Sequence, residues 1–524
     1  MIEITEQIKH YNSIKANAFS SFKAGNLEKA LDYIYIAGLM AWQNHLGFWC
    51  DDELENLLLQ IGMKIRDDNS SKKNTGGSKK ITFIGSNIMV KKGLCAGHCG
   101  VLKQWAELLG YDSQKQSLYI THCHPYNTSR LKIESLAGVP AYNLSEHESY
   151  LKRIHDLINH INDDAPDDIF LFIDPNDVIA ITALNALQNK PRIFFFNHAD
   201  HLFWLGKSAA NYFIEFRGKG AEYSKKYRNI NESYIIPLTA SIKPKKSSLI
   251  EWKIKKNATI SISIGRFNKV MADNGIYFRT IRELLERFPN HYHIFVTDPP
   301  SFDFIKEYLG DNEDIKERFI ITGPYSDLSP FYGMADFLID TFPESGSMVQ
   351  IEAMSCKLPV VAYFNKKFSL ASAMDFLPSK YPFIGSTKGE IINHSAELIG
   401  NPEIKKYWGK RLYSIYHQEL APENIQKTLM NILYNNQKPV KTPLEECEYD
   451  REYVRGLYGS EKSEIYNRLI IQSVFKDSEF SIKDNFGFYL NALKNDEFNV
   501  KQKLMYALMS LIGFKGVSMY LKLH

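Results

Sequence analysis

The sequence predicts an α/β protein with two doubly wound domains, each built on a mainly parallel sheet that helices cover on both faces. Short, nearly continuous apolar strands alternate with helical stretches from residue 81 to about residue 237, and the alternation restarts at residue 259. Apolar strands alternating with helices are typical of a parallel sheet that is buried on both sides. The length of 524 residues agrees, because chains longer than ~250–300 residues usually divide into several cores.

Composition and charge narrow the class of protein. The chain is 44% hydrophobic and 23% charged, with a formal net charge of +3, so we expect an ordinary globular protein with no nucleic-acid partner. The N-terminus has no basic stretch followed by an apolar one, and no apolar run reaches the ~18 residues of a spanning helix. The six cysteines form no disulfide framework, which fits a reducing cytoplasm.

The first part of the chain is expected to be helical. Ile8, Tyr11, Ile14 and Ala18 follow helical spacing, so residues 1–66 are assigned as a helical N-terminal segment. Residues 67–80, DDNSSKKNTGGSKK, contain no apolar side chain and are predicted to be a linker.

Two α/β domains and a C-terminal extension follow. We assign residues 81–240 to the first domain, 241–437 to the second and 438–524 to a helical extension. After Glu497 this extension carries lysines and no acidic side chain. A helix of that kind either packs on the core or contacts the inner face of an anionic membrane peripherally, and we keep both alternatives.

The segment that carries most chemistry is ADFLIDTFPESGSMVQIEAMSCKLPVVAY, residues 335–363. Its pattern is strand, turn, helix and strand, which puts Glu344 in the loop at the carboxyl end of a strand and Glu352 in the helix that follows. Ligands of open parallel sheets bind in the crevice outside such strand ends. Ser345, Gly346 and Ser347 at the helix N-terminus would offer backbone N–H groups to a diphosphate. The two carboxylates suit the paired hydroxyls of a ribose and a sugar.

This segment resembles the E-x7-E motif of GT-B glycosyltransferases, especially the retaining enzymes of glycosyltransferase family 4. EAMSCKLPVV is similar to the family's segment at this place, with Lys357 where glycine is usual. The resemblance implies two facing Rossmann-like domains and a nucleoside diphosphate sugar, linked to UDP or GDP, as donor. It also implies that Glu344 contacts the donor sugar at the catalytic centre, Ser345 to Ser347 the diphosphate and Glu352 the ribose. We expect no cofactor and no metal.

Two further segments of the second domain fit this resemblance. SIGRFNKVMADNG, residues 263–275, carries Arg266 and Lys269, three residues apart where the family usually has five. The resemblance implies that these cations neutralise the donor diphosphate as it leaves, an electrostatic form of catalysis. TGPYSDLSPFYGMADF, residues 322–337, would border the nucleobase through Gly323, Pro324 and Tyr325, although G-P-Y also forms ordinary turns.

The first domain holds the candidate acceptor residues. Gly97 and His98 of CAGHCG, residues 95–100, are expected in a loop near the donor phosphate or the acceptor. FFFNHADHLFWLG, residues 194–206, places His198, Asp200 and His201 directly after a strand, where acid/base groups are expected.

The resemblance implies an active-site histidine after the preceding strand, where this chain has Asp174. Either Asp174 or His198 therefore takes that role, and we favour His198. A zinc site made from the nearby cysteines and histidines is not expected, because their spacing matches no established zinc motif. That set is Cys95, His98, Cys99, His122, Cys123 and His124.

The sequence therefore predicts a cytoplasmic glycosyltransferase of the hexosyltransferase type. It would move a sugar, with retention, to a saccharide, lipid-linked or protein acceptor, and the resemblance suggests bacterial cell-surface polysaccharide biosynthesis. The alternatives are a protein glycosyltransferase of the family 41-like kind, a sugar-nucleotide epimerase, and a non-catalytic carbohydrate-binding or assembly subunit with a GT-B-like core.

Overall fold

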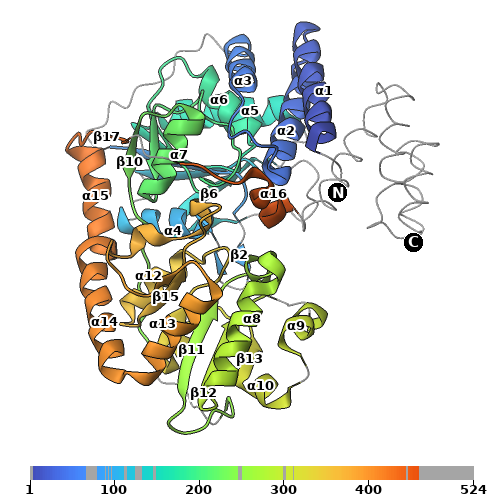
Figure 1. Ribbon diagram of the computed structural model, residues 1–524. Coiled ribbons are helices and arrows are strands. Elements are labelled where there is room, and N and C mark those ends of the chain that lie inside the picture. Colours follow the sequence, from blue (N-terminus) through green and yellow to red (C-terminus); the bar gives the residue numbers. More distant parts are fainter. Residues whose placement is uncertain are drawn as a thin grey trace, which may run out of the picture.

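The protein is described here from a computed structural model. It describes residues 4–66, 79–88, 90–91, 94–95, 97–110, 115–123, 133–144, 149–245, 251–298, 302–310, 312–443 and 447–459. Residues 67–78 of the predicted linker lie outside these ranges, and so does the lysine-bearing C-terminal stretch that was expected to be helical. In the described part, two α/β halves are stacked one on the other (Figure 1).

The first half contains a nine-stranded sheet with the order β17-β10-β9-β8-β7-β1-β4-β6-β5. All pairings are parallel except those that add β5 and β17 at the two edges. The strands are β1 (Ile81–Gly85), β4 (Gln116–Ile120), β5 (Ser135–Leu136), β6 (Val139–Asn143), β7 (Asp168–Phe172), β8 (Arg192–Phe196), β9 (Tyr212–Glu215), β10 (Glu232–Ile235) and β17 (Val440–Lys441), with the hairpin β2 (Val90–Lys91) and β3 (Leu94–Cys95) apart from the sheet. The helices are α4 (His98–Leu108), α5 (Tyr150–Asp164), α6 (Val178–Ala186) and α7 (Gly218–Arg228). This is the predicted doubly wound arrangement.

The central strands are buried on both faces because successive side chains point to opposite sides. Phe194 and Phe196 of β8 belong to one core with Trp105 of α4. Ile193 and Phe195 belong to another core, which includes the apolar faces of α5 and α6. This alternation explains why strands such as RIFFF are continuous apolar runs in the sequence.

Three N-terminal helices complete the second of these cores. They are α1 (Ile4–Lys23), α2 (Leu27–Asn44) and α3 (Asp52–Lys64). Two carboxylates attach them to the first half. Glu55 is buried and accepts hydrogen bonds from three consecutive N–H groups, those of residues 206–208, at 2.7 to 2.9 Å. Glu28 accepts hydrogen bonds from the N–H groups of Tyr150 and Leu151 at the start of α5. The helix dipole also stabilises a negative charge at this position. The helical segment is thus packed into the first domain.

The second half contains a six-stranded parallel sheet with the order β13-β12-β11-β14-β15-β16. Its strands are β11 (Thr259–Ile264), β12 (His291–Val296), β13 (Phe319–Thr322), β14 (Phe337–Ile339), β15 (Val360–Tyr363) and β16 (Ile384–Gly385). Its helices are α8 (Ala272–Arg287), α9 (Phe302–Leu309), α10 (Glu313–Arg318), α11 (Ser329–Met334), α12 (Met348–Ser355) and α13 (Lys388–Gly400), with short 3-10 turns η2 (Phe267–Val270), η3 (Ser369–Ala371) and η4 (Met374–Phe376). This is the second doubly wound domain that the sequence predicts.

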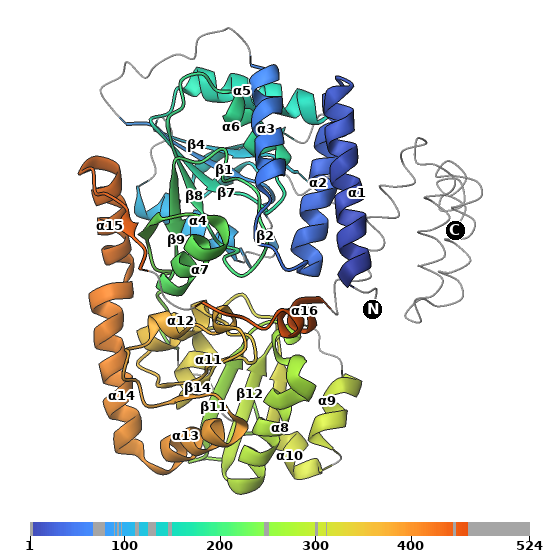
Figure 2. The ribbon, with the colours of Figure 1, turned by 45° about the horizontal axis from the view of Figure 1, so that its top comes forward.

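The chain returns to the first half after the second sheet. Helix α14 (Pro402–Ile415), the π-helical turn η5 (Tyr416–Leu420) and α15 (Pro422–Tyr434) form a column along one side of both halves (Figure 2). Arg192 of β8 donates to the carbonyls of Ile432 and Leu433 at the end of this column. Strand β17 then joins the first sheet, and α16 (Arg451–Gly459) lies between the halves. No described helix combines the length and apolar character needed to cross a membrane.

Candidate active site

The topology of the second sheet brings two loops together. The strand order reverses between β11 and β14, and ligands of such sheets bind at that switch point. Lys269, in η2 after β11, places Nζ 3.0 Å from Oε1 of Glu344 and donates to the carbonyl of Ser345 at 2.6 Å. The N–H of Glu344 in turn donates to the carbonyl of Lys269 at 3.3 Å. The cation and the first glutamate of the motif therefore meet at the switch point.

The turn between β14 and α12 is held by a buried carboxylate that the sequence analysis did not single out. Asp340 accepts hydrogen bonds from the Ser345 hydroxyl, the Gly346 N–H at 2.9 Å and the Gln350 side chain at 2.7 Å. The N–H groups of Ser345 and Ser347 donate to the Ala371 carbonyl and the Ser345 hydroxyl. All three N–H groups that we expected to be open to a diphosphate are thus engaged within the chain, so a diphosphate here would meet the next turn of the helix or displace these bonds.

Two backbone positions near this turn restrict the side chain. A Cβ on Gly346 would lie 2.5 Å from a methyl group of Val349 and 3.2 Å from Oδ1 of Asp340, so a larger residue here would require the Val349 side chain to shift. Lys357, where the family usually has glycine, has φ of 62°, in the left-handed region that glycine adopts most easily. The turn is therefore formed with a lysine whose backbone is strained.

Glu352 lies one to two turns into α12. The Tyr332 hydroxyl donates to its Oε2 at 2.5 Å. Burial raises the pKa of the Glu352 carboxyl to about 7, and the hydrogen bond from Tyr332 opposes that rise. A carboxyl group with this pKa changes its charge near neutral pH.

The other predicted donor-site residues are more exposed. Arg266 is exposed at the start of η2, at the switch point beside Lys269. Gly323, Pro324 and Tyr325 follow β13, the edge strand. Gly323 has φ of 112°, and a Cβ there would lie 2.9 Å from the Thr297 carbonyl oxygen. The Tyr325 ring is 42% exposed and contacts Phe331, so it offers an accessible aromatic face.

The first sheet has its own switch point, between β1 and β7, and three predicted side chains converge there. They are Asp174 after β7, His198 after β8 and His98 at the first position of α4, behind Gly97. One ligand atom from each lies within 4.8 Å of the others. The two imidazole rings stack at 4.2 Å between centroids, and Nε2 of His98 is 3.9 Å from Oδ1 of Asp174. The sequence alternatives Asp174 and His198 thus occupy one site, together with His98.

Burial governs the electrostatics of this cluster. It lowers the pKa of His198 to about 3, with a further contribution from His98, and it also lowers the pKa of His98. Both imidazoles are therefore neutral at physiological pH. Asp174 is held by the Asn87 side chain, whose Nδ2 donates to Oδ2 at 2.9 Å.

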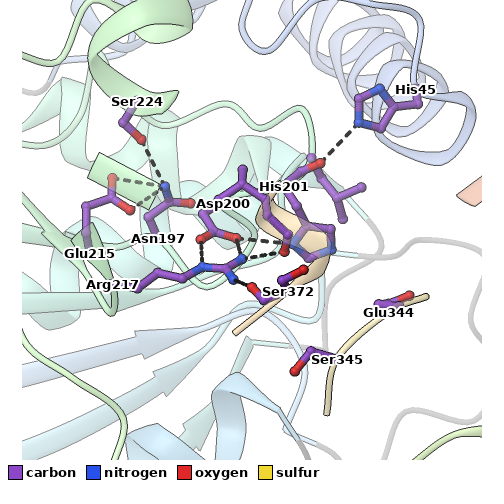
Figure 3. Close-up of polar contacts among 12 residues, drawn as sticks. His45, Asn197, Asp200, His201, Glu215, Arg217, Ser224, Glu344, Ser345 and Ser372 are labelled. Carbon is purple, nitrogen blue, oxygen red and sulfur yellow. Dashed lines mark hydrogen bonds and ion pairs between the residues drawn. The ribbon is translucent and has the colours of Figure 1, made fainter. Parts of the chain in front are cut away.

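Asp200 and His201 have a different environment (Figure 3). Asp200 is fully buried and forms a two-pronged ion pair with Arg217, at 2.6 and 2.9 Å. Arg217 also donates to the carbonyls of Leu370 and Ser372 in the second half, at 2.9 and 2.6 Å. Nδ1 of His201 donates to Oδ1 of the ionised Asp200 carboxylate at 3.3 Å. This pair therefore links the two halves, and both oxygens of Asp200 are already engaged.

Helix α16 brings a residue that sequence analysis missed. Tyr458 is buried against the rings of His45, His201 and Phe368. Burial raises the pKa of its phenol well above the usual value; the charges of Glu344 and Asp200 raise it as well, and that of Arg217 opposes them. The C-terminal segment thus comes close to Glu344, in the predicted donor site. Its sequence carries no motif that would have signalled this.

Comparisons with known proteins agree on the fold. No protein-family model matches the sequence, and no curated protein matches it significantly. Among solved structures, a glycosyltransferase from Rickettsia africae matches with a TM-score of 0.54 and 12% identity, over 68% of this chain and 98% of its own. Sucrose-phosphate synthase from Thermosynechococcus elongatus matches with a TM-score of 0.52 and 15% identity, over 68% of this chain and 99% of its own. The chain has the GT-B fold, as the sequence predicted.

Proposed function

We propose that this chain is a glycosyltransferase that takes a sugar from a nucleoside diphosphate sugar bound to its second domain. The observation that carries the proposal is the junction of Lys269 with Glu344 and Ser345 at the switch point of the second sheet. A cation and a carboxylate at this place suit a diphosphate and the sugar attached to it, respectively. The same junction is expected from the resemblance to retaining family 4 enzymes.

The donor roles follow from charge and position. Lys269 and the exposed Arg266 would stabilise the negative charge that develops on the diphosphate as the glycosidic bond breaks. Glu344 would accept hydrogen bonds from sugar hydroxyls once the donor displaces part of its contact with Lys269. Glu352 keeps one oxygen on Tyr332 and would accept the ribose hydroxyls with the other. Tyr325 and the turn before it would border the nucleobase.

The acceptor side is proposed at the first sheet. Asp174 and His198 follow β7 and β8, and His98 begins α4. Their ligand atoms lie within 4.8 Å of one another, and the acceptor hydroxyl of a saccharide or lipid-linked glycan would meet the donor sugar beside them. A hexosyl group and a role in cell-surface glycan synthesis are the finer parts of this proposal, and they rest on the resemblance alone.

The test is a binding screen followed by a turnover assay. Nucleoside diphosphates and their sugars are screened by thermal shift on the wild type, on Glu352→Gln and on Lys269→Ala. Glu403→Gln, at an exposed position of α14, is the matched control. A ligand at ~100 Kd should add roughly 2.7 kcal/mol to the stability of the native state.

We expect one nucleotide family to stabilise the wild type and the control, with a smaller response from both site variants. Release of the nucleoside diphosphate from the matching sugar nucleotide then measures turnover. If no nucleotide stabilises the wild type, the donor-site proposal is refuted. If nucleotides bind but the sugar bond stays intact with any saccharide offered, the non-catalytic alternative replaces the enzyme.

A further inference from the structure

The cluster at the switch point of the first sheet has the composition of a metal site. His98 begins α4, Asp174 follows β7 and His198 follows β8, so the fold assembles three residues that are far apart in the chain. Their ligand atoms lie within 4.8 Å of one another. Two imidazole nitrogens and one carboxylate oxygen form a set that Zn²⁺ and related divalent ions accept.

The contact between His98 and Asp174 is not a hydrogen bond. The 3.9 Å between Nε2 of His98 and Oδ1 of Asp174 is too long for a hydrogen bond. Within the described part of the chain, Nδ1 of His198 is buried without a hydrogen-bond partner. Such a buried nitrogen costs free energy, and metal coordination is one way to use its lone pair.

The surroundings prepare these groups for coordination. Asn87 holds Oδ2 of Asp174, as outer hydrogen bonds commonly orient metal ligands. The thiol of Cys99 lies 3.6 Å from Nε2 of His98 and competes with a metal ion for that nitrogen. The same thiol also donates to the Asn87 carbonyl at 3.1 Å.

We propose that His98, Asp174 and His198 bind a divalent transition-metal ion, with Zn²⁺ the best chemical fit. Zinc bonds to nitrogen and oxygen are about 2.0–2.2 Å, which puts tetrahedral ligand atoms about 3.3 Å apart. Side-chain movements on the order of 1 Å would bring the cluster to that spacing. Three protein ligands leave a fourth position for water or a substrate oxygen.

This inference goes beyond the proposed function and does not rest on it, since it concerns binding of an ion and not turnover. It also differs from what the sequence led us to expect about metals. We expected no metal, and the cysteine-rich set that raised the question shares only His98 with this cluster.

The test uses the full-length chain after removal of bound metal. Zn²⁺ affinity is measured by competition with a chelating dye, and Co²⁺ is added separately because its visible spectrum reports nitrogen and oxygen ligands. The variants are Asp174→Asn, which keeps the shape of the side chain, and His198→Ala. The control is His155→Ala, at an exposed position of α5. Unfolding midpoints without metal show whether each variant is folded.

We expect about one Zn²⁺ per wild-type chain and an unchanged affinity in the control. Losing a ligand should weaken binding at least ~100-fold, beyond the effect of losing an outer hydrogen bond. The proposal is overturned if the metal-free wild type binds no Zn²⁺ at micromolar concentration. It is also overturned if folded Asp174→Asn and His198→Ala bind Zn²⁺ and Co²⁺ as the wild type does.

Discussion

The protonation state of Glu352 should control how tightly the donor binds. Burial raises the pKa of this carboxyl to about 7, so about half of the molecules carry a neutral Glu352 at neutral pH. Ribose hydroxyls are donors and bind best to the ionised carboxylate. Binding therefore selects the ionised form, and the apparent affinity falls with its population.

The size of the effect follows from that pKa. About 90% of the carboxyl is ionised at pH 8 and about 10% at pH 6, so the apparent Kd should rise roughly tenfold, or about 1.4 kcal/mol, over this range. Glu352→Gln has no ionisable group at this position. We expect its binding to be weaker than that of the wild type at pH 8 and independent of pH.

The assay is calorimetric titration with the nucleotide sugar at several pH values between 5.5 and 8. The nucleotide sugar is preferred to the free nucleoside diphosphate because a terminal phosphate also titrates near pH 6. A wild-type affinity that stays constant or improves toward pH 6 would refute the reasoning. The same would follow if Glu352→Gln kept the wild-type slope.

Three further predictions concern the frame that supports the site. Gly346→Ala, whose new Cβ would lie 2.5 Å from a Val349 methyl, should cost about 1–3 kcal/mol of stability and reduce nucleotide binding; Gly389→Ala, with no atom within 4 Å of the added Cβ, is the control in thermal unfolding. Arg217→Met leaves Asp200 buried without its ion-pair partner, so urea unfolding should show a loss of about 3–5 kcal/mol. The control Arg282→Met breaks a pair with Glu286 in which the side chains are 44% and 43% exposed, and it should cost at most about 0.5 kcal/mol. Burial lowers the pKa of His291 to about 3, below its unfolded value of about 6.5. Its contribution to stability is therefore complete above pH 6.5 and is lost as the pH falls toward 3, by roughly 2 kcal/mol at pH 5; His291→Gln should flatten the dependence, and an equal pH slope in both proteins would contradict the assignment.

The two-domain fold was predictable because its signal is local. Strands buried on both faces must be apolar nearly throughout, and segments such as RIFFF show this pattern within five residues. The turn from β14 into α12 is local as well, since Glu344 and Glu352 belong to one strand–turn–helix unit. Short-range periodicity and motif spacing therefore led to the fold and to the position of the loop that we propose binds the donor.

Contacts between distant segments were decided by the tertiary structure. Lys269 meets Glu344 because the strand order reverses between β11 and β14, and no local pattern encodes that adjacency. Asp340 was visible only as the end of a strand, whereas the structure shows that it binds the turn and engages the N–H groups we expected to be open. The left-handed backbone of Lys357 could not be predicted from its distance to the motif in the sequence.

The first domain shows the same division most clearly. From the sequence, Asp174 and His198 were alternatives for one role, and His98 belonged to a separate loop. The parallel sheet brings the carboxyl ends of its strands to one edge, so the three side chains form one cluster. Tyr458 belongs to α16, which lies between the domains and follows Lys357 by more than 90 residues in the sequence. Sequence periodicity determines which faces are buried, because burial is a property of each strand and helix; the composition of a site depends on which strand ends become neighbours, and that is settled only when the whole chain has folded.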